Sequence, residues 1–144
     1  MLFNNLINSQ YKDEIYMVLI IGGARNGKLS YVLEKTGIQP AEVACDFASA
    51  ESSRVLNALQ DAIRRALAVG ADLSALVDRL LERSPGVIVI CDEVGGGVVP
   101  VGAEERVWRE AVGRVCCTLA ERADYVERVF CGIPMRLKGE GEWS

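Results

Sequence analysis

One stretch near the N-terminus, MVLIIGGARNGKLS at residues 17–30, places the tightest constraint on how this chain can fold. It begins with the apolar run Val18–Ile21, whose length and β-branched residues are typical of a buried strand. The run leads into Gly22–Lys28, which reads GGARNGK and matches the G-x-x-x-x-G-K pattern of a phosphate-binding loop. The stretch therefore predicts a strand, a glycine-rich turn and a helix in succession.

The chemistry of this loop predicts a site for the phosphates of a nucleotide. Glycines allow the backbone to turn so that successive N–H groups point at a phosphate, and the helix that follows adds the partial positive charge of its N-terminus. Lys28 supplies a mobile charge for the β- and γ-phosphates, and Arg25 is also placed to reach a phosphate. We predict nucleotide binding by the loop and the first helical turn, namely Gly22, Gly23, Ala24, Arg25, Asn26, Gly27, Lys28, Leu29 and Ser30.

The residue after the lysine departs from the pattern. The motif has Ser or Thr there, to place a hydroxyl on Mg²⁺, but this chain has Leu29, and Ser30 comes one residue later. A shift of one residue turns a side chain by about 100° around a helix, so Ser30 cannot simply replace the missing hydroxyl. A glycine-rich turn that binds nothing is the alternative interpretation. The strand before the loop, the helix after it and the lysine in register favour phosphate binding.

Beyond the loop, apolar runs of strand length alternate with segments of helical periodicity. The run GVIVIC at 86–91 has no polar residue, which is typical of a central parallel strand covered on both faces. The alternation predicts an α/β fold, a single P-loop NTPase-like domain whose mostly parallel sheet has helices on both faces. Further strands are predicted at 41–46 and 124–131, and helices at 49–69, 73–83 and 103–122.

The domain is predicted to span residues 17–138. Residues 1–16 are interpreted as an N-terminal extension and residues 139–144 as a C-terminal tail, with the polar stretch 135–144 expected to be frayed. No low-complexity linker interrupts the predicted domain.

Composition and charge exclude several functional classes. The chain has 144 residues and a net charge of -4, which disfavours a nucleic-acid-binding protein. No apolar run approaches the ~20 residues that span a bilayer, and the N-terminus does not resemble a secretory signal. The five cysteines form no C-x-x-C motif and suit a reduced, cytoplasmic setting. The sequence contains no histidine, so no step can use imidazole as a base, nucleophile or metal ligand.

Acidic residues stand at the ends of two predicted strands, where ligands of open α/β sheets bind. They are Asp46, Asp92 and Glu93. Phosphoryl transfer needs a cation held by a carboxylate, and Glu93 is favoured because it leads into a triple glycine that lets backbone approach a ligand. We predict Lys28 and Glu93 as catalytic residues, and Asp46 and Glu93 as Mg²⁺ ligands. For Asp46, a solvated acid at a strand end is an equally good interpretation.

Three motifs follow one another along the chain: GGARNGK, then CDEVGGGVVP, then GRVCCTLAERADYVERVFCGIPMRLK. Together they resemble the adenosylcobinamide kinase / adenosylcobinamide-phosphate guanylyltransferase family of cobalamin biosynthesis. In that family the matching segments read Gly-Gly-Ala-Arg-Ser-Gly-Lys-Ser, then Asn-Glu-Val-Gly-x-Gly-Ile-Val-Pro, then a Gly-Arg-x-Asn-Gln helix and a strand ending in Gly-Ile-Pro-x-x-x-Lys. The resemblance covers residues 17–32 and 86–138.

The resemblance implies a parallel P-loop fold, ATP or GTP as substrate, Mg²⁺ as cofactor, the corrinoid adenosylcobinamide as acceptor and a homotrimer. The chain departs from the family in several respects. It is shorter between the loop helix and Gly86, and it lacks the histidine that becomes guanylylated in family members. In addition, Asp92 stands where the family has Asn.

We therefore expect a phosphotransferase, a kinase of cobalamin biosynthesis that moves a phosphoryl group from ATP or GTP to adenosylcobinamide, without the histidine-dependent guanylyl transfer. Two alternatives are a non-catalytic nucleotide-binding or accessory protein and a P-loop kinase for another small molecule. A guanylyltransferase that uses another nucleophile, such as Asp46 or a cysteine, is a more remote alternative. The residues do not choose between ATP and GTP.

Overall fold

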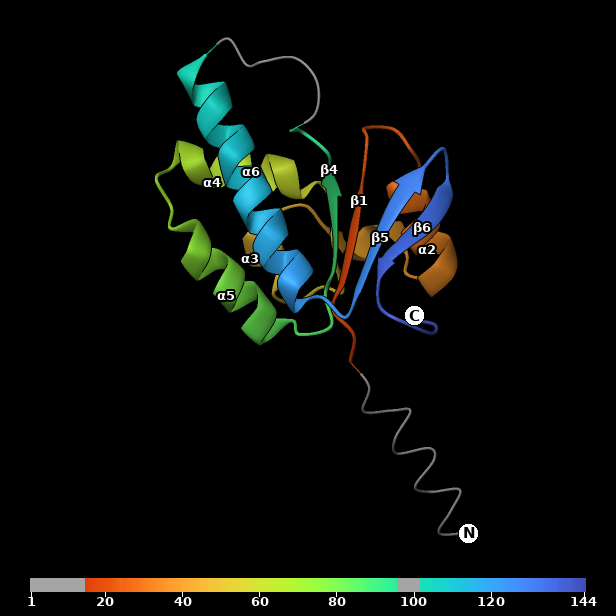
Figure 1. The fold of residues 1–144 in the computed structure, drawn as a ribbon. Coiled ribbons are helices and arrows are strands. Elements are labelled where there is room, and N and C mark those ends of the chain that lie inside the picture. Colours follow the sequence, from red (N-terminus) through yellow and green to blue (C-terminus); the bar gives the residue numbers. More distant parts are fainter. Residues whose placement is uncertain (1–14, 96–101) are drawn as a thin grey trace, which may run out of the picture.

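The computed structural model describes residues 15–95 and 102–144, which form a central sheet with helices packed around it (Figure 1). The sheet of the described residues has six strands in the order β2-β3-β4-β1-β5-β6. The first five in sequence pair in parallel, and β6 runs antiparallel beside β5. Their bounds are β1 (Val18–Gly22), β2 (Val43–Ala44), β3 (Val55–Leu56), β4 (Ile88–Asp92), β5 (Tyr125–Phe130) and β6 (Ile133–Lys138).

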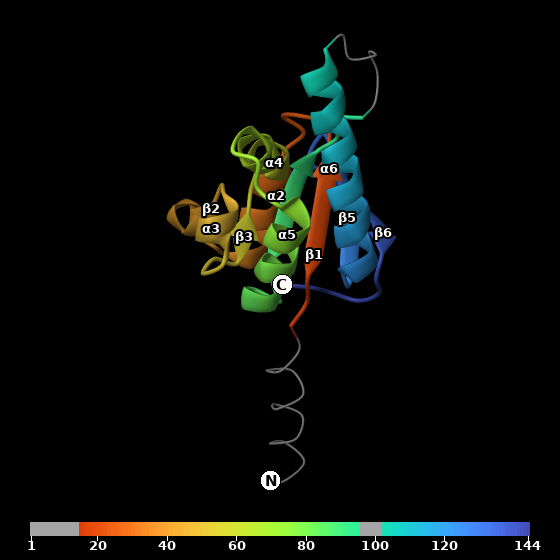
Figure 2. The same cartoon turned by 90° about the vertical axis from the view of Figure 1, so that its left-hand side faces the viewer.

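The helices divide between the two faces of the sheet. One face is covered by α2 (Lys28–Thr36), and the other packs against the remaining helices α3 (Phe47–Ala50), α4 (Leu59–Ala68), α5 (Leu73–Arg83) and α6 (Ala103–Arg122). In the view of Figure 2, α6 lies beside the central strands, and α3 and β2 lie at the opposite end of the sheet from β6. None of the described helices is long and apolar enough to cross a membrane.

The central strands are apolar on both faces because each face carries its own core. Val18 and Ile20 of β1 pack in the core beneath α2, whereas Leu19 packs in the larger core beneath α4 and α6. The β4 run is buried from Ile88 to Cys91 and pairs with β1 in register, with Val18 opposite Ile88. The predicted α/β sheet, mostly parallel with helices on both faces, is therefore confirmed.

The predicted helix at 49–69 is wrong over its first half. Val55 and Leu56 form β3, which pairs with β2 on one side and β4 on the other and is fully buried. The spacing of the apolar residues matched a helical period, but burial between two neighbouring strands overrides that local pattern. The helix α4 begins only after Ala58, which has a φ of 57°. The predicted strand at 41–46 is also shorter, because Pro40–Glu42 forms a 3₁₀ turn.

The predicted fraying of residues 135–144 is wrong as well. Residues 133–138 form β6, and the side chain of Trp143 is 1 % exposed. Its ring packs edge-on against Tyr31 of α2, with 6.3 Å between centroids, and Lys35 lies over its face. The end of the chain therefore covers the core beneath α2. Most of the predicted N-terminal extension, residues 1–14, lies outside the described residues, as do Gly96 and Gly97 of the triple glycine.

Candidate nucleotide-binding site

The glycine-rich loop joins the carboxyl end of β1 to the N-terminus of α2. At Gly22 a Cβ atom would collide with the carbonyl oxygen of Val129, so the close approach of β5 requires glycine there. Gly27 has a φ of 84°, a left-handed conformation that glycine adopts without steric cost, and α2 begins directly after it. The two glycines therefore allow the loop to pass close to β5 and to lead directly into the first turn of α2.

Lys28 is held at the centre of the loop although it is a charged residue. Its side chain is 6 % exposed. The ammonium group donates to the carbonyl oxygens of Gly22 at 3.1 Å and Gly23 at 2.7 Å. It also forms an ion pair with a carboxylate oxygen of Asp92 at 2.7 Å. Burial of the lysine is tolerated because these three partners replace water around its charge.

Lys28 and Asp92 border a cavity of about 240 Å³. The second half of the loop lines it, together with Ile90 of β4 and Asn57, the residue directly after β3. The predicted nucleotide-binding residues that line it are Arg25, Asn26, Gly27, Lys28, Leu29 and Ser30. The sequence analysis did not predict Asn57 as a residue of this site. It directly follows β3 and would have been a candidate if residues 55–56 had been recognised as a strand.

The three predicted acids occupy different places. Glu93 lies at the same edge as Lys28, but its carboxylate pairs with Arg128 of β5, with 2.7 Å between Nε and Oε1. Asp46 caps the N-terminus of α3 and accepts hydrogen bonds from the backbone N–H of Ser49 at 2.7 Å and from its hydroxyl at 3.2 Å. These bonds lower the pKa of the Asp46 carboxyl. The structure thus brings together Lys28 and Asp92, and it places the side chains of Glu93 and Asp46 in other interactions.

A buried glutamine at the start of α4 holds Asp92 in position. The side-chain oxygen of Gln60 accepts the backbone N–H of Asp92 at 3.0 Å, and the backbone carbonyl of Gln60 accepts the indole N–H of Trp108 at 2.8 Å. Gln60 is 8 % exposed. The end of β4 is therefore tied to α4 and, through Trp108, to α6.

A turn between β5 and β6 supports the loop from the other side. The backbone N–H of Gly132 donates to the carbonyl oxygen of Asn26 at 2.8 Å, and that of Cys131 donates to the Asn26 side chain at 3.3 Å. The loop is thus fixed at both its base and its tip before any ligand binds, which reduces the ordering cost of binding.

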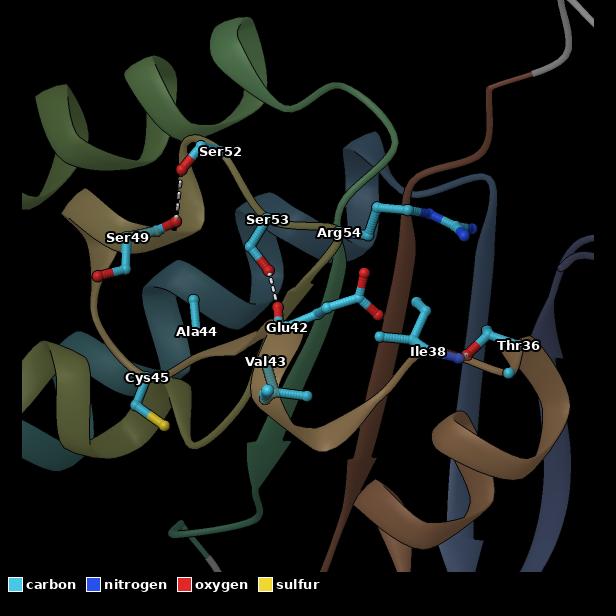
Figure 3. Close-up of a pocket in the computed structure, with 12 residues that line it drawn as sticks. Thr36, Ile38, Glu42, Val43, Ala44, Cys45, Ser49, Ser52, Ser53 and Arg54 are labelled. Atoms are coloured by element: carbon cyan, nitrogen blue, oxygen red, sulfur yellow. Dashed lines mark hydrogen bonds between the residues drawn. The ribbon is translucent and has the colours of Figure 1, made fainter.

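A larger cavity of about 770 Å³ lies along the β2 edge of the sheet (Figure 3). Its hydroxyl groups are already used locally, since Ser53 donates to the backbone carbonyl of Glu42 at 2.6 Å and Ser52 to that of Ser49 at 3.4 Å. The residues that line it include none of the predicted nucleotide-binding residues. In the described part of the chain, no three or more carboxylate, thiol or imidazole groups converge as a metal site.

Comparison with known proteins identifies a family that matches the part of the chain after the glycine-rich loop. The model of the family "Cobinamide kinase / cobinamide phosphate guanyltransferase" matches residues 52–137, which run from just before β3 into β6 and make up more than half of the chain. The glycine-rich loop precedes the matched range. That family has a P-loop NTPase-like fold, which confirms the predicted fold class.

A curated relative is similar over a shorter region. The bifunctional adenosylcobalamin biosynthesis protein CobP of Pseudomonas aeruginosa is 38% identical over 66 residues, which are 46% of this chain and 38% of that protein. The matched part thus spans less than half the length of the curated relative. Taken with the family match over β3 to β6, the sheet order and the loop at the end of β1, the similarity leads to one conclusion: this chain belongs to the cobinamide kinase / cobinamide phosphate guanyltransferase family.

Proposed function

We propose that this chain binds a nucleoside triphosphate in the loop cavity and transfers its γ-phosphoryl group to adenosylcobinamide, as a kinase of cobalamin biosynthesis. The observation that carries the proposal is the buried Lys28, held by two loop carbonyls and Asp92 at the border of a cavity. A lysine in a glycine-rich loop between a strand and a helix is suited to phosphates. Membership of the family supports the corrinoid acceptor.

In the proposed reaction, the glycine-rich loop binds the phosphates of the nucleotide. The backbone N–H groups at the start of α2 and the ammonium group of Lys28 would hold the β- and γ-phosphates. Asp92 keeps the ammonium group oriented toward the cavity until phosphate oxygens replace that carboxylate as its partners. Catalysis then consists of holding the donor and neutralising the charge that develops on the transferred group.

Mg²⁺ enters as the metal complex of the nucleotide, and the residues of the cavity fit it. Mg²⁺ is bound through one or two carboxylates together with substrate phosphates and water, so a single acid is sufficient. Asp92 and the hydroxyl-bearing Ser30 line the cavity, whereas Leu29 packs partly against the core beneath α2. We propose Asp92, rather than Asp46 or Glu93, as the protein ligand. The ion would supply charge neutralisation at the phosphates.

The guanylyl-transfer half of the family's chemistry is proposed to be absent. The chain contains no histidine to carry a guanylyl group. We also propose a cytoplasmic location and a homo-oligomer, the latter from the family resemblance to trimeric members.

The test is a binding and turnover measurement on Lys28→Ala. We expect ATP or GTP affinity to fall by about tenfold or more, because a charged hydrogen-bond donor to phosphate is lost. Transfer to adenosylcobinamide, measured by mass, should be abolished. Lys35→Ala is the matched control, since Lys35 lies on the same helix but pairs with the exposed Glu142.

The outcomes separate the alternatives. Equal nucleotide affinity in Lys28→Ala and the wild-type chain would contradict the loop assignment. Tight nucleotide binding without phosphorylated product would indicate a nucleotide-binding accessory protein. Product with another alcohol, but none with adenosylcobinamide, would indicate a kinase of different specificity.

A further inference from the structure

A second cavity, of about 310 Å³, meets the loop cavity at Asp92. The loop cavity includes Leu29, which packs in the core beneath α2. The second cavity includes Ile21 and Cys116, which pack on the α6 face of the sheet. Two cavities that share one carboxylate at the sheet edge provide separate places for a donor and an acceptor, as group transfer requires.

The lining of this cavity suits an aliphatic group that carries a polar end. Ile21, Val94 and Val112 supply apolar surface. The charged residues of the lining are Asp92 and Glu93 at the sheet edge and Arg109 on α6. Its volume is at the lower end of the range of about 300–1,000 Å³ for pockets that enclose drug-sized ligands. It can therefore enclose one arm of a large acceptor, but not a macrocycle such as a corrin ring.

A glycine in α6 forms part of its wall. Gly113 lies in the interior of a 20-residue helix, where glycine is less favourable than alanine because it loses more backbone freedom on folding. A Cβ atom built at Gly113 meets no atom of the described residues within 4 Å. Neither a turn nor close packing against these residues requires glycine at this position. The absent side chain instead leaves space along the wall of the cavity.

We infer that this cavity is the acceptor site, which takes a hydroxyl-bearing aliphatic arm of the acceptor, and that Gly113 leaves the room this arm needs. The inference rests on the proposed kinase function. In the transfer, the hydroxyl oxygen of the arm bonds to the γ-phosphorus, and the bond from that phosphorus to the β–γ bridging oxygen breaks. The nucleoside diphosphate leaves with the electron pair, and the hydroxyl proton passes to water at the cavity mouth.

The first experiment fills the cavity from α6. Gly113→Leu adds a helix-favouring side chain into open space, so folding is expected to be retained. We expect the KM for adenosylcobinamide to rise by about tenfold or more, because the added side chain would occupy part of an apolar pocket. The affinity for ATP or GTP should stay within about twofold of the wild-type value. Gly113→Ala should raise the KM less. Cys117→Leu, on the exposed side of α6, is the control and should change neither value.

The second experiment needs no turnover. Cys116 borders the cavity, so a small thiol reagent such as methyl methanethiosulfonate is expected to reach its thiol through the cavity. In a Cys117→Ser chain, adenosylcobinamide should slow labelling of Cys116 by about fivefold or more at saturation. Labelling of the exposed Cys45 should not change.

The two proposals fail in different ways. If wild-type protein forms no phosphorylated product, the kinase function is contradicted, and protection of Cys116 still decides whether the cavity takes the acceptor. If wild-type protein turns over and Gly113→Leu leaves the KM for adenosylcobinamide unchanged, the acceptor site is elsewhere. An unprotected Cys116 overturns the inference in either case.

Discussion

Lys28 and Asp92 are the pair of residues on which the candidate site depends. The lysine is almost fully buried, whereas the carboxylate is 29% exposed at the mouth of the cavity. The ion pair can therefore form without a ligand and be replaced when one binds. Phosphate oxygens can reach the ammonium group from the cavity, and water or a cation can reach the carboxylate. A buried lysine that already faces a cavity needs little rearrangement on binding.

Asp92→Asn separates the two roles of this carboxylate. Without its ion-pair partner, Lys28 should bind metal-free nucleotide more tightly, by up to about tenfold. Turnover with Mg²⁺ should fall by about tenfold, because the neutral amide oxygen of Asn is a weaker ligand for the ion than the carboxylate that it replaces. Affinity measured with EDTA and with Mg²⁺, together with product formation, checks both effects. If Glu93→Gln abolishes turnover and Asp92→Asn does not, Glu93 holds the role first predicted for it.

A buried acid, Glu127, links β5 to α2 and β6. Burial tends to raise the pKa of its carboxyl, but hydrogen bonds from Tyr31 and Arg136 outweigh that effect and hold the pKa below its ordinary value. Arg136 Nε lies 2.8 Å from the carboxylate. Because the pKa is lower in the folded than in the unfolded chain, Glu127 stabilises the fold above the unfolded pKa, and this contribution is lost as the pH falls through the folded value.

Glu127→Gln should therefore lower the free energy of unfolding at pH 7 by about 2 kcal/mol, the usual contribution of hydrogen bonds to a charged group. The difference from the wild-type chain should shrink as the pH is lowered from about 5 to 3, around the ordinary glutamate pKa. Urea denaturation over this pH range measures it. Glu142→Gln, at a side chain that is 86% exposed, is the control; a constant difference between Glu127→Gln and wild type would contradict the assigned pKa direction.

At the scale of elements, the β5–β6 hairpin connects the C-terminal part of the chain to the loop. Its turn residues Cys131 and Gly132 have φ values of 50° and 77°, the left-handed pattern that two-residue hairpin turns prefer. Both residues donate backbone hydrogen bonds to Asn26. The hairpin therefore contributes to the shape of the phosphate-binding loop although it lies about a hundred residues away in sequence.

Cys131→Asn should stabilise this turn, because Asn adopts a positive φ more readily than Cys. We expect the free energy of unfolding to rise by about 0.5–1 kcal/mol, measured by thermal or urea denaturation. Cys117→Asn on the exposed face of α6 is the matched control, since the helix propensities of Cys and Asn are similar. A lower stability of Cys131→Asn would show that the sulfur makes a contribution larger than the backbone strain.

At the scale of the whole molecule, the end of the chain completes one of the two cores. Trp143 is among the largest fully buried side chains, and its ring contacts Tyr31 of α2, the helix that begins at Lys28. Val32 of α2 belongs to the same core. The core beneath α2 therefore depends on residues from both ends of the described chain. A change at residue 143 is expected to weaken the support of the helix that carries the loop.

Trp143→Ala should lower the free energy of unfolding by about 3–5 kcal/mol, the usual cost of removing a buried aromatic side chain. Glu140→Ala, at an exposed neighbouring position, should change it by less than about 0.5 kcal/mol. Equilibrium denaturation measures both. A cost below about 1 kcal/mol for Trp143→Ala would mean that the tail does not cover the core in solution.

Local patterns in the sequence were sufficient for the loop, for α2 and α6, and for the parallel arrangement of the sheet. The glycines and Lys28 form one contiguous motif, and the apolar run at 86–91 indicates a central strand without reference to any other part of the chain. These features depend on the backbone conformation and the burial of residues that are close in sequence, so a short segment of sequence is enough to predict them.

The remaining features depended on contacts between distant segments. The strand β3 exists because β2 and β4 lie on either side of it. Trp143 is buried because it packs in the core that residues of α2 and β5 also form. Asp92 and Glu93 are adjacent in sequence, but their ion-pair partners are distant from them and from each other. Asp92 pairs with Lys28 of the loop, and Glu93 pairs with Arg128 of β5. Side chains that alternate along a strand meet different neighbours, so only the assembled sheet determined which acid faces the lysine.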